Sequence, residues 1–183
     1  MKKLIKRSTL LLTTLFSVVS CGNNGNTTDS EKSPIVEDKY IIQGRLSDYY
    51  IVIPNESKAR IDFASSELAG FLEQATKCRL EVIKESQVKK NYKYISLGNT
   101  TQFQENVSDI DLSRLNGTHS AYFITTRNDN IYINSNIYGI GDGTLYGVYD
   151  MLNDMIDYKY YYEDDNFLPD IQSAPAQTEV KKN

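Results

Sequence analysis

The sequence predicts an α/β (α+β) domain in which two amphipathic helices pack on one face of a mixed β-sheet, in the order β-α-β-β-β-β-α-β. Short runs of β-branched and aromatic residues, each bounded by turn residues, predict the strands. Two longer segments whose apolar residues recur at spacings of three and four predict the helices. Such helices bury only one face, so they need a sheet to cover.

The first half of the domain supplies a strand, a helix and two further strands. Residues 49–53 read as a strand that Pro54-Asn55 ends. Residues 58–76 form the first helix, whose inward positions share a helical spacing: Ile61, Ala64, Leu68, Phe71, Leu72 and Ala75. Residues 79–83 form a short strand with Leu80 and Val82 directed inward, and residues 94–97 form the next strand.

The second half supplies a hairpin, a second helix and a last strand. We expect residues 101–118 to hold about one helical turn and a loop. Residues 121–127 and 131–134 form two strands joined by Asn128-Asp129-Asn130, whose residues tolerate positive φ, so a hairpin follows. The second helix presents one apolar face, made of Leu145, Val148, Tyr149, Leu152, Met155 and Ile156. Residues 159–162 form the last strand.

The first twenty residues have the pattern of a secretion signal. Lys2, Lys3, Lys6 and Arg7 precede a short apolar run, which is too short to span a bilayer comfortably. The run ends in Val18-Val19-Ser20-Cys21, which resembles the bacterial lipobox. That resemblance implies that the Cys21 thiol receives a diacylglyceryl group and that the peptide is cut just before it. We therefore expect membrane attachment through lipid on Cys21.

The expected boundaries follow from these segments. Residues 1–20 are the signal, and residues 21–38 are small and polar, which predicts a flexible tether. Residues 39–170 form the α/β domain, and residues 171–183 lack periodicity, which predicts a disordered tail. Gly22 stands where an inner-membrane retention signal often has Asp, so we expect the outer membrane of a two-membrane cell.

Composition excludes several kinds of site. Without the signal, 16 basic and 24 acidic residues remain, so 16 − 24 gives a net charge of −8. That charge argues against nucleic acid as a partner. Cys78 and His119 are the only other cysteine and the only histidine, so we expect no metal site, no cofactor and no His-based catalytic triad. Cys78 is expected to be a buried, inert thiol and His119 a surface residue.

Three local patterns bear on possible chemistry. The glycines of Gly139-Ile140-Gly141-Asp142-Gly143 precede a helix, but the spacing fits neither nucleotide motif, so a close-packing turn is preferred to a phosphate site. The acidic run 163–165 is read as a solvated segment, because adjacent carboxylates do not face each other across a glycosidic bond. Tyr160, Tyr161 and Tyr162, together with Tyr158, either pack on the strand or form a face that binds a glycan or a partner.

Two stretches together resemble a known domain. They are Tyr50-Ile51-Val52-Ile53-Pro54 with the helix that contains Ala64–Leu72, and Gly143–Leu152 with the segment from Tyr160 to Pro169. This resembles the small N-terminal α/β domain found ahead of the catalytic barrel in α-glucuronidases and family 20 β-hexosaminidases. The resemblance covers residues 48–170 and implies a setting in polysaccharide or glycoconjugate breakdown. It implies no catalytic residue, because in that family the catalytic carboxylates lie in the barrel.

These observations predict a lipid-anchored, non-catalytic accessory domain that binds a glycan or docks a partner. The alternative is the N-terminal piece of a lipoprotein glycoside hydrolase whose barrel is missing. A domain related to one that packs on a barrel should expose apolar surface. We therefore also expect self-association or a partner such as a glycosidase barrel.

Overall fold

The computed structural model describes residues 39–115, 119–135, 142–162, 165–176 and 181–182. Every described residue belongs to the compact unit Glu37–Asn183. The expected signal, the expected lipidation site Cys21 and the expected tether lie outside the described residues. Within the described ranges, no helix is both long and apolar enough to span a membrane.

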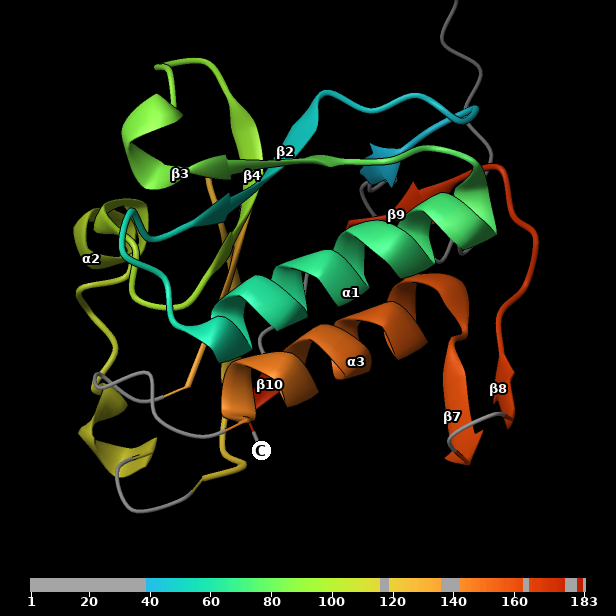
Figure 1. Cartoon of the computed structure of the whole chain (residues 1–183). Coiled ribbons are helices and arrows are strands. Elements are labelled where there is room, and N and C mark those ends of the chain that lie inside the picture. Colours follow the sequence, from blue (N-terminus) through green and yellow to red (C-terminus); the bar gives the residue numbers. More distant parts are fainter. Residues whose placement is uncertain (1–38, 116–118, 136–141, 163–164, 177–180, 183) are drawn as a thin grey trace, which may run out of the picture. The chain divides into compact units, whose positions relative to one another are not determined.

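A mixed sheet forms the centre of this unit (Figure 1). Its five longer strands are β2 (Tyr49–Ile53), β3 (Glu81–Lys84), β4 (Lys93–Leu97), β5 (Phe123–Arg127) and β6 (Asn130–Asn134). The two-residue strand β10 (Lys181–Lys182) adds to one edge, and the order is β10–β5–β6–β4–β2–β3. Strands β3, β2, β4 and β6 are parallel to one another, and β5 is antiparallel to β6. The mixed sheet is therefore confirmed.

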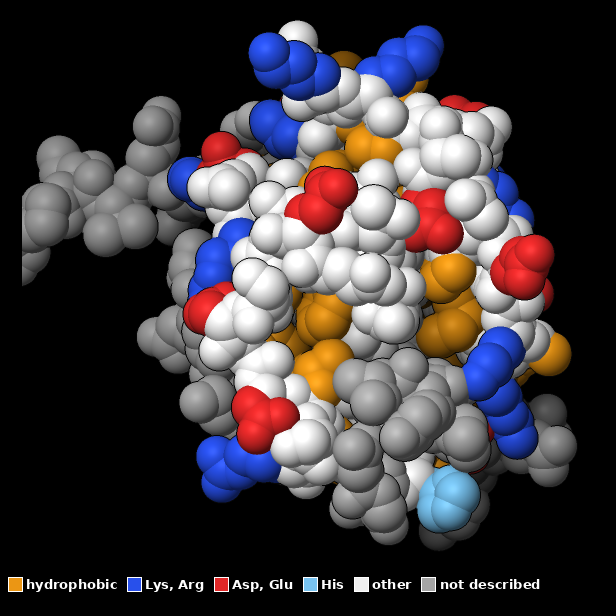
Figure 2. Space-filling view, turned by 90° about the vertical axis from the view of Figure 1, so that its left-hand side faces the viewer, with side chains coloured by type: hydrophobic (Ala, Val, Ile, Leu, Met, Phe, Trp, Pro, Cys, Tyr) orange, Lys and Arg blue, Asp and Glu red, His pale blue; other side chains and the backbone are white. Residues whose placement is uncertain are grey.

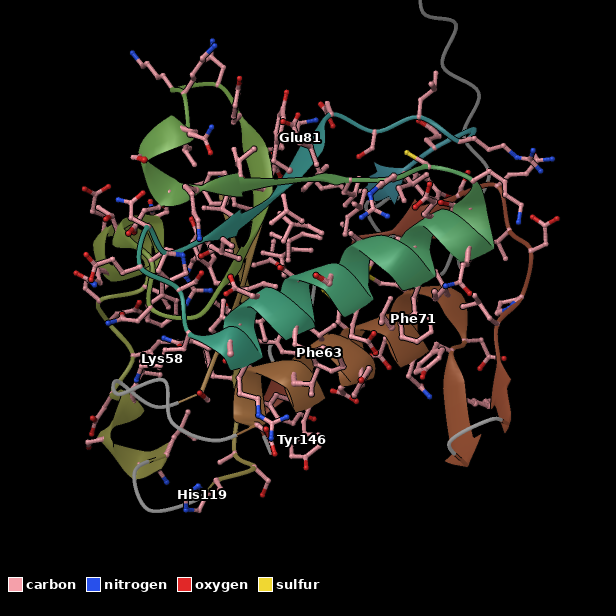
Figure 3. The ribbon with its side chains drawn as sticks, viewed as in Figure 1. Lys58, Phe63, Phe71, Glu81, His119 and Tyr146 are labelled. Carbon is pink, nitrogen blue, oxygen red and sulfur yellow. The ribbon has the colours of Figure 1, made fainter. Side chains whose placement is uncertain are left out.

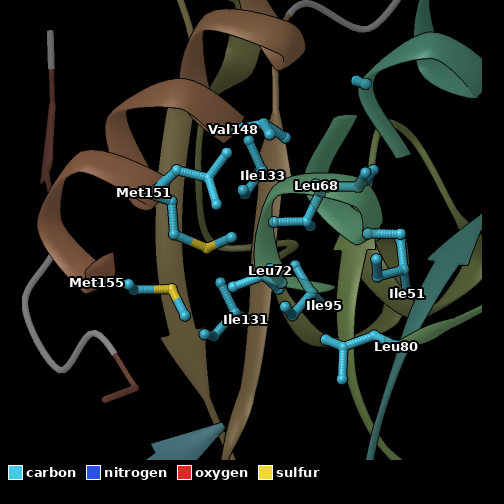
Figure 4. Close-up of a cluster of buried hydrophobic side chains, with 14 of the residues drawn as sticks. Ile51, Leu68, Leu72, Leu80, Ile95, Ile131, Ile133, Val148, Met151 and Met155 are labelled. Atoms are coloured by element: carbon cyan, nitrogen blue, oxygen red, sulfur yellow. The ribbon is translucent and has the colours of Figure 1, made fainter. Parts of the chain in front are cut away.

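Two long helices, α1 (Ala59–Thr76) and α3 (Gly143–Ile156), cover one face of the sheet (Figure 1). Most of the predicted apolar stripe of each helix is buried. Phe71 and Tyr149 are only half-buried, and Met151, which the prediction left out, is fully buried. Figure 4 shows side chains of the two helices directed towards strand residues, among them Leu68, Leu72, Val148, Met151, Ile95, Ile131 and Ile133. The predicted packing of two helices on one face is confirmed.

The close approach of α3 to the sheet depends on two glycines. A Cβ atom on Gly143 would lie 2.2 Å from the backbone oxygen of Ala121, and one on Gly147 would lie 2.6 Å from Cγ2 of Ile133. The predicted packing role is therefore confirmed for Gly143. Gly139 and Gly141 lie outside the described residues.

The predicted hairpin joins β5 to β6. Asn128 and Asp129 have φ angles of 50° and 65°, which suits a tight turn between antiparallel strands. The Tyr49 hydroxyl donates to the Asp129 backbone oxygen at 2.8 Å and so ties the turn to β2.

The opposite face of the sheet carries a second, smaller core. The helix α2 (Thr101–Asn106) and the 3-10 turns η1 (Glu85–Gln87) and η2 (Leu112–Leu115) lie in the connections between β3 and β5. Phe103, Val107 and Leu112 pack with strand residues such as Val52 and Tyr132. The expectation of a helical turn and a loop in 101–118 is confirmed for the described part, which adds η2.

The C-terminal segment differs from the expectation of a disordered tail. Strand β9 (Ala174–Pro175) pairs with β1 (Tyr40–Ile42), and Ala174 is fully buried. The Ile171 N–H also donates to the Ala75 carbonyl at 2.8 Å. For residues 171–176 the prediction was wrong, because a few apolar contacts and backbone hydrogen bonds hold the segment without any repeating pattern.

The last predicted strand exists as β7 (Lys159–Tyr162), but it pairs with β8 (Asp165–Phe167) in a separate sheet. Leu80 is buried as predicted, whereas Val82 is 36% exposed. Val82 lies on β3, the edge strand, where the cover from α1 is incomplete.

Candidate functional site

The candidate site lies on the outer surface along the line where α1 and α3 meet, which we call the seam. The two helices run in the same direction, and two contacts tie them. Arg60 Nε lies 2.9 Å from Asp142 Oδ1, as an ion pair without the alignment of a hydrogen bond. The Tyr149 hydroxyl donates to Glu67 Oε2 at 2.8 Å. Glu67 lies seven residues beyond Arg60, and Tyr149 lies seven residues beyond Asp142. Seven residues are about two helical turns, so the two helices are in register.

Phe63 and Tyr146 lie between these two ties, one on each helix. Phe63 is 48% exposed and Tyr146 is 43% exposed. Figure 3 shows them on neighbouring turns, towards the ends at which both helices begin. We call these two residues the aromatic rung. Helical spacing places both outside the buried stripes, so their rings are not needed for the core.

The other end of the seam is closed by aromatic packing. Phe71 contacts Tyr158 with ring centroids 4.5 Å apart and meets Tyr149 edge-on at 6.5 Å. Tyr158 is only 4% exposed. The packing interpretation is therefore right for this tyrosine. At one end of the seam the aromatic rings therefore pack against one another within the chain. Nearer the other end, the two rings of the aromatic rung are about half exposed to solvent.

The helices that carry the seam are acidic. Helix α1 contains one basic and three acidic residues, and α3 contains no basic and two acidic residues, so 1 − 5 gives −4. The single base, Arg60, is paired with Asp142. Glu73 is paired with Arg79, which follows α1. Interfaces between proteins commonly have an apolar centre and a polar rim, and complementary charge across that rim favours association.

The sequence-predicted site residues are placed only in part. Cys21 and the acidic residues 163–164 lie outside the described residues. The backbone of Tyr160, Tyr161 and Tyr162 forms β7, but their side chains are not described, so neither reading of them is tested.

Two other side chains singled out by type are described. His119 is exposed, as predicted. Cys78 is half-buried, and burial raises the pKa of its thiol. Among the described residues, no three His, Cys, Asp or Glu side chains lie close enough together to hold a metal ion.

Comparison with known proteins gives a distant structural likeness. No protein-family model matches the chain, and no curated protein matches it. The fold is similar to parts of glycoside hydrolases. One is a GH138 enzyme targeting pectin rhamnogalacturonan II, at 19% identity and a TM-score of 0.38, with 58% of this chain and 13% of that chain covered. The other is CpGH84D, at 14% identity and a TM-score of 0.39, with 67% of this chain and 20% of that chain covered. The matched part thus spans a small fraction of either enzyme, and no family follows from it.

Sequence reasoning did not single out the aromatic rung. The signal was present, because Phe63 and Tyr146 are the aromatic residues of the two helices that fall outside the predicted buried stripes. Periodicity alone does not show that the two lie on adjacent turns. That requires the parallel register of the helices, which only the structure supplies.

Proposed function

We propose that this chain is a lipid-anchored, non-catalytic accessory domain of carbohydrate breakdown that docks a partner protein through the outer α1–α3 seam. The aromatic rung carries the proposal, since two large rings stand open between fixed cross-helix ties. Single exposed apolar residues are common, but aromatic side chains near the centre of an interface often act as its anchors.

The rung is large enough to anchor an interface but not to form one alone. An aromatic side chain buries about 150–250 Å², so a half-exposed pair has about 200 Å² left to bury. At about 25 cal/mol per Å², that area is worth about 5 kcal/mol before the costs of association. A stable interface covers about 800 Å² per partner. The acidic outer surfaces of α1 and α3 supply the remaining contact area, which favours a partner with a basic border.

The proposed location follows from the lipobox-like segment that ends in Cys21. Lipid on Cys21 would hold the domain at a membrane, with residues 21–38 as a spacer. We propose the outer membrane, in line with Gly22. Metabolic labelling with a clickable fatty acid, compared with Cys21→Ser, tests this. Label that persists in the variant would contradict it.

Self-association is the simplest form of docking to test. The mature chain 21–183 with Cys21→Ser is expected to form concentration-dependent oligomers in sedimentation equilibrium if a second copy is the partner. Phe63→Ser/Tyr146→Ser should abolish them. Tyr40→Ser/Leu46→Ser is the matched control, because these side chains are 37% and 77% exposed away from the seam. Equal loss of oligomers in both variants would contradict docking through the seam. A monomeric parent chain would mean that the partner is a different protein.

The second candidate is the N-terminal piece of a glycoside hydrolase lipoprotein. The same open seam favours it, because a following barrel could cover the aromatic rung. Sequencing the DNA downstream of the stop codon tests this candidate. A barrel-coding frame there supports the fragment, and unrelated sequence supports a free-standing docking domain.

The tyrosines of β7 carry the glycan alternative. A glycan-array assay of the mature chain with Tyr161→Ala and Tyr162→Ala tests it. Specific binding that either change removes would place a glycan site on β7. Binding that both variants retain would exclude that site.

A further inference from the structure

A stacked pair of tyrosines lies on the side of the sheet opposite α1 and α3. Tyr50 of β2 is in register with Tyr94, which belongs to the second core. The rings of Tyr50 and Tyr92 are 4.3 Å apart between centroids and only 10° from parallel. Both residues are half-buried, so the stack is anchored in the second core while part of its surface faces solvent.

One side of this stack is basic. Residues 84–93 contain four lysines and one glutamate, so 4 − 1 gives +3 within a mature chain of −8. Lys84 donates to Ser57 and Lys93 pairs with Asp48, each at 2.8 Å. Lys89 and Lys90 are exposed and have no carboxylate partner among the described residues. Figure 2 shows basic side chains standing out at the upper edge, where the loop between η1 and β4 lies in Figure 1.

The other side of the stack is acidic. Glu81 of β3 is in register with Tyr50 and is exposed (Figure 3). The hydrogen bond between Tyr92 and Tyr50 is the largest cause that raises the pKa of the Tyr50 hydroxyl. The negative charge of Glu81 raises this pKa further. The Lys89 ammonium lies 5.8 Å from the centre of the Tyr92 ring. A carboxylate, two rings and an ammonium therefore follow one another across a single surface, which we call the tyrosine patch (Glu81, Tyr50, Tyr92, Lys89 and Lys90).

We propose that the tyrosine patch binds a carboxylated polysaccharide. Apolar ring surface suits the C–H faces of a sugar, and the tyrosine hydroxyls and Glu81 suit its hydroxyl groups. Lys89 and Lys90 suit a carboxylate. Glu81 disfavours a densely charged polymer, and the net charge of −8 disfavours an anionic membrane surface. The inference takes its carbohydrate setting from the proposed function but uses a different surface.

The test compares ligands that share one backbone. The mature chain 21–183 with Cys21→Ser is titrated with carboxymethyl dextran, dextran and dextran sulfate, and with phosphatidylglycerol vesicles. We expect binding to carboxymethyl dextran and at least tenfold weaker binding to the others. Lys89→Gln/Lys90→Gln should weaken binding about tenfold and reduce its salt dependence. Tyr92→Leu should weaken binding at every salt concentration without changing that dependence.

A charge-matched control separates the patch from net charge. Lys58→Gln/Lys77→Gln removes two exposed lysines near the ends of α1 and should change the affinity less than twofold. The tyrosine patch shares no residue with the aromatic rung, so failure of the docking proposal would leave this one intact. Circular dichroism melting confirms that each variant is folded. Equal losses in both lysine pairs, no binding to carboxymethyl dextran, or preferential binding to dextran sulfate or vesicles would overturn the proposal.

Discussion

Gly147 and Gly70 form a matched pair that tests how α3 packs. Both are helix-interior glycines, but a Cβ atom at Gly70 would meet nothing within 4 Å. At Gly147 the new Cβ would lie 2.6 Å from Cγ2 of Ile133 and 3.1 Å from Cδ2 of Tyr122. Ile133 and Tyr122 are 0% and 8% exposed, so neither side chain has room to withdraw.

The two substitutions should therefore change stability in opposite directions. Gly70→Ala should raise the free energy of unfolding by about 0.5–1 kcal/mol, because alanine loses less backbone entropy in a helix. Gly147→Ala gains the same helical preference but must overpack the core, which costs about 1–3 kcal/mol. A clash as short as 2.6 Å belongs near the upper end of that range, so the net loss should be about 1–2 kcal/mol.

Urea denaturation followed by circular dichroism measures both effects as shifts of the midpoint at constant slope. In a domain of this size, 1 kcal/mol also corresponds to a shift of about 3 °C in Tm. A Gly147→Ala protein as stable as its parent would refute the close packing of α3 on β6. Equal shifts of the same sign in both variants would refute the assigned cause.

Four further outcomes are expected. Partial burial by itself raises the pKa of the Glu85 carboxyl. Backbone hydrogen bonds from Asn55 and Thr101, at 2.9 and 2.6 Å, together outweigh burial, so the pKa is lowered from 4.5. Glu85→Gln should thus cost about 1–3 kcal/mol at pH 7. That cost should shrink below pH 4.5, because the stability from a lowered carboxyl pKa is lost as the pH falls through the folded value; a cost independent of pH would contradict this. Leu72→Ala empties a fully buried site and should cost about 2–5 kcal/mol in denaturant titrations. Burial, followed by the charges of Asp129 and Asp48, raises the pKa of Tyr49 to about 12. Tyr49→Phe should therefore remove a tyrosinate absorbance step near pH 12. The stability that the raised pKa represents is present below pH 10 and is lost as the pH rises through 12. Cys78 should react with a thiol reagent at pH 8 more slowly in the folded than in the urea-unfolded protein carrying Cys21→Ser, and equal rates would contradict the raised thiol pKa.

The elements that sequence predicted well are those with a repeating physical signal. Helical spacing of apolar residues located α1 and α3, and the face each buries, because burial imposes that period on the side chains. The hairpin followed from Asn128-Asp129, which adopt the left-handed conformation that the turn requires.

The parts that escaped prediction depend on contacts between distant segments. Ala174 is held by pairing with β1, more than 130 residues earlier, so nothing local marks it as ordered. Strand β7 had the right local pattern, but its partner β8 decides which sheet it joins. Phe63 and Tyr146 lie near each other only because the two helices are in register. Tyr50 and Tyr92 stack only because of the path of the loop between η1 and β4.

The most direct test of the docking proposal is photo-crosslinking from the aromatic rung in living cells. Benzoylphenylalanine is placed at position 63 or 146 of the full-length chain, and at position 46 as an exposed control. Both rung positions should give the same discrete adduct, and position 46 should not give it. Adducts that are absent from both rung positions, or equally strong at position 46, would contradict the claim that the α1–α3 seam docks a partner.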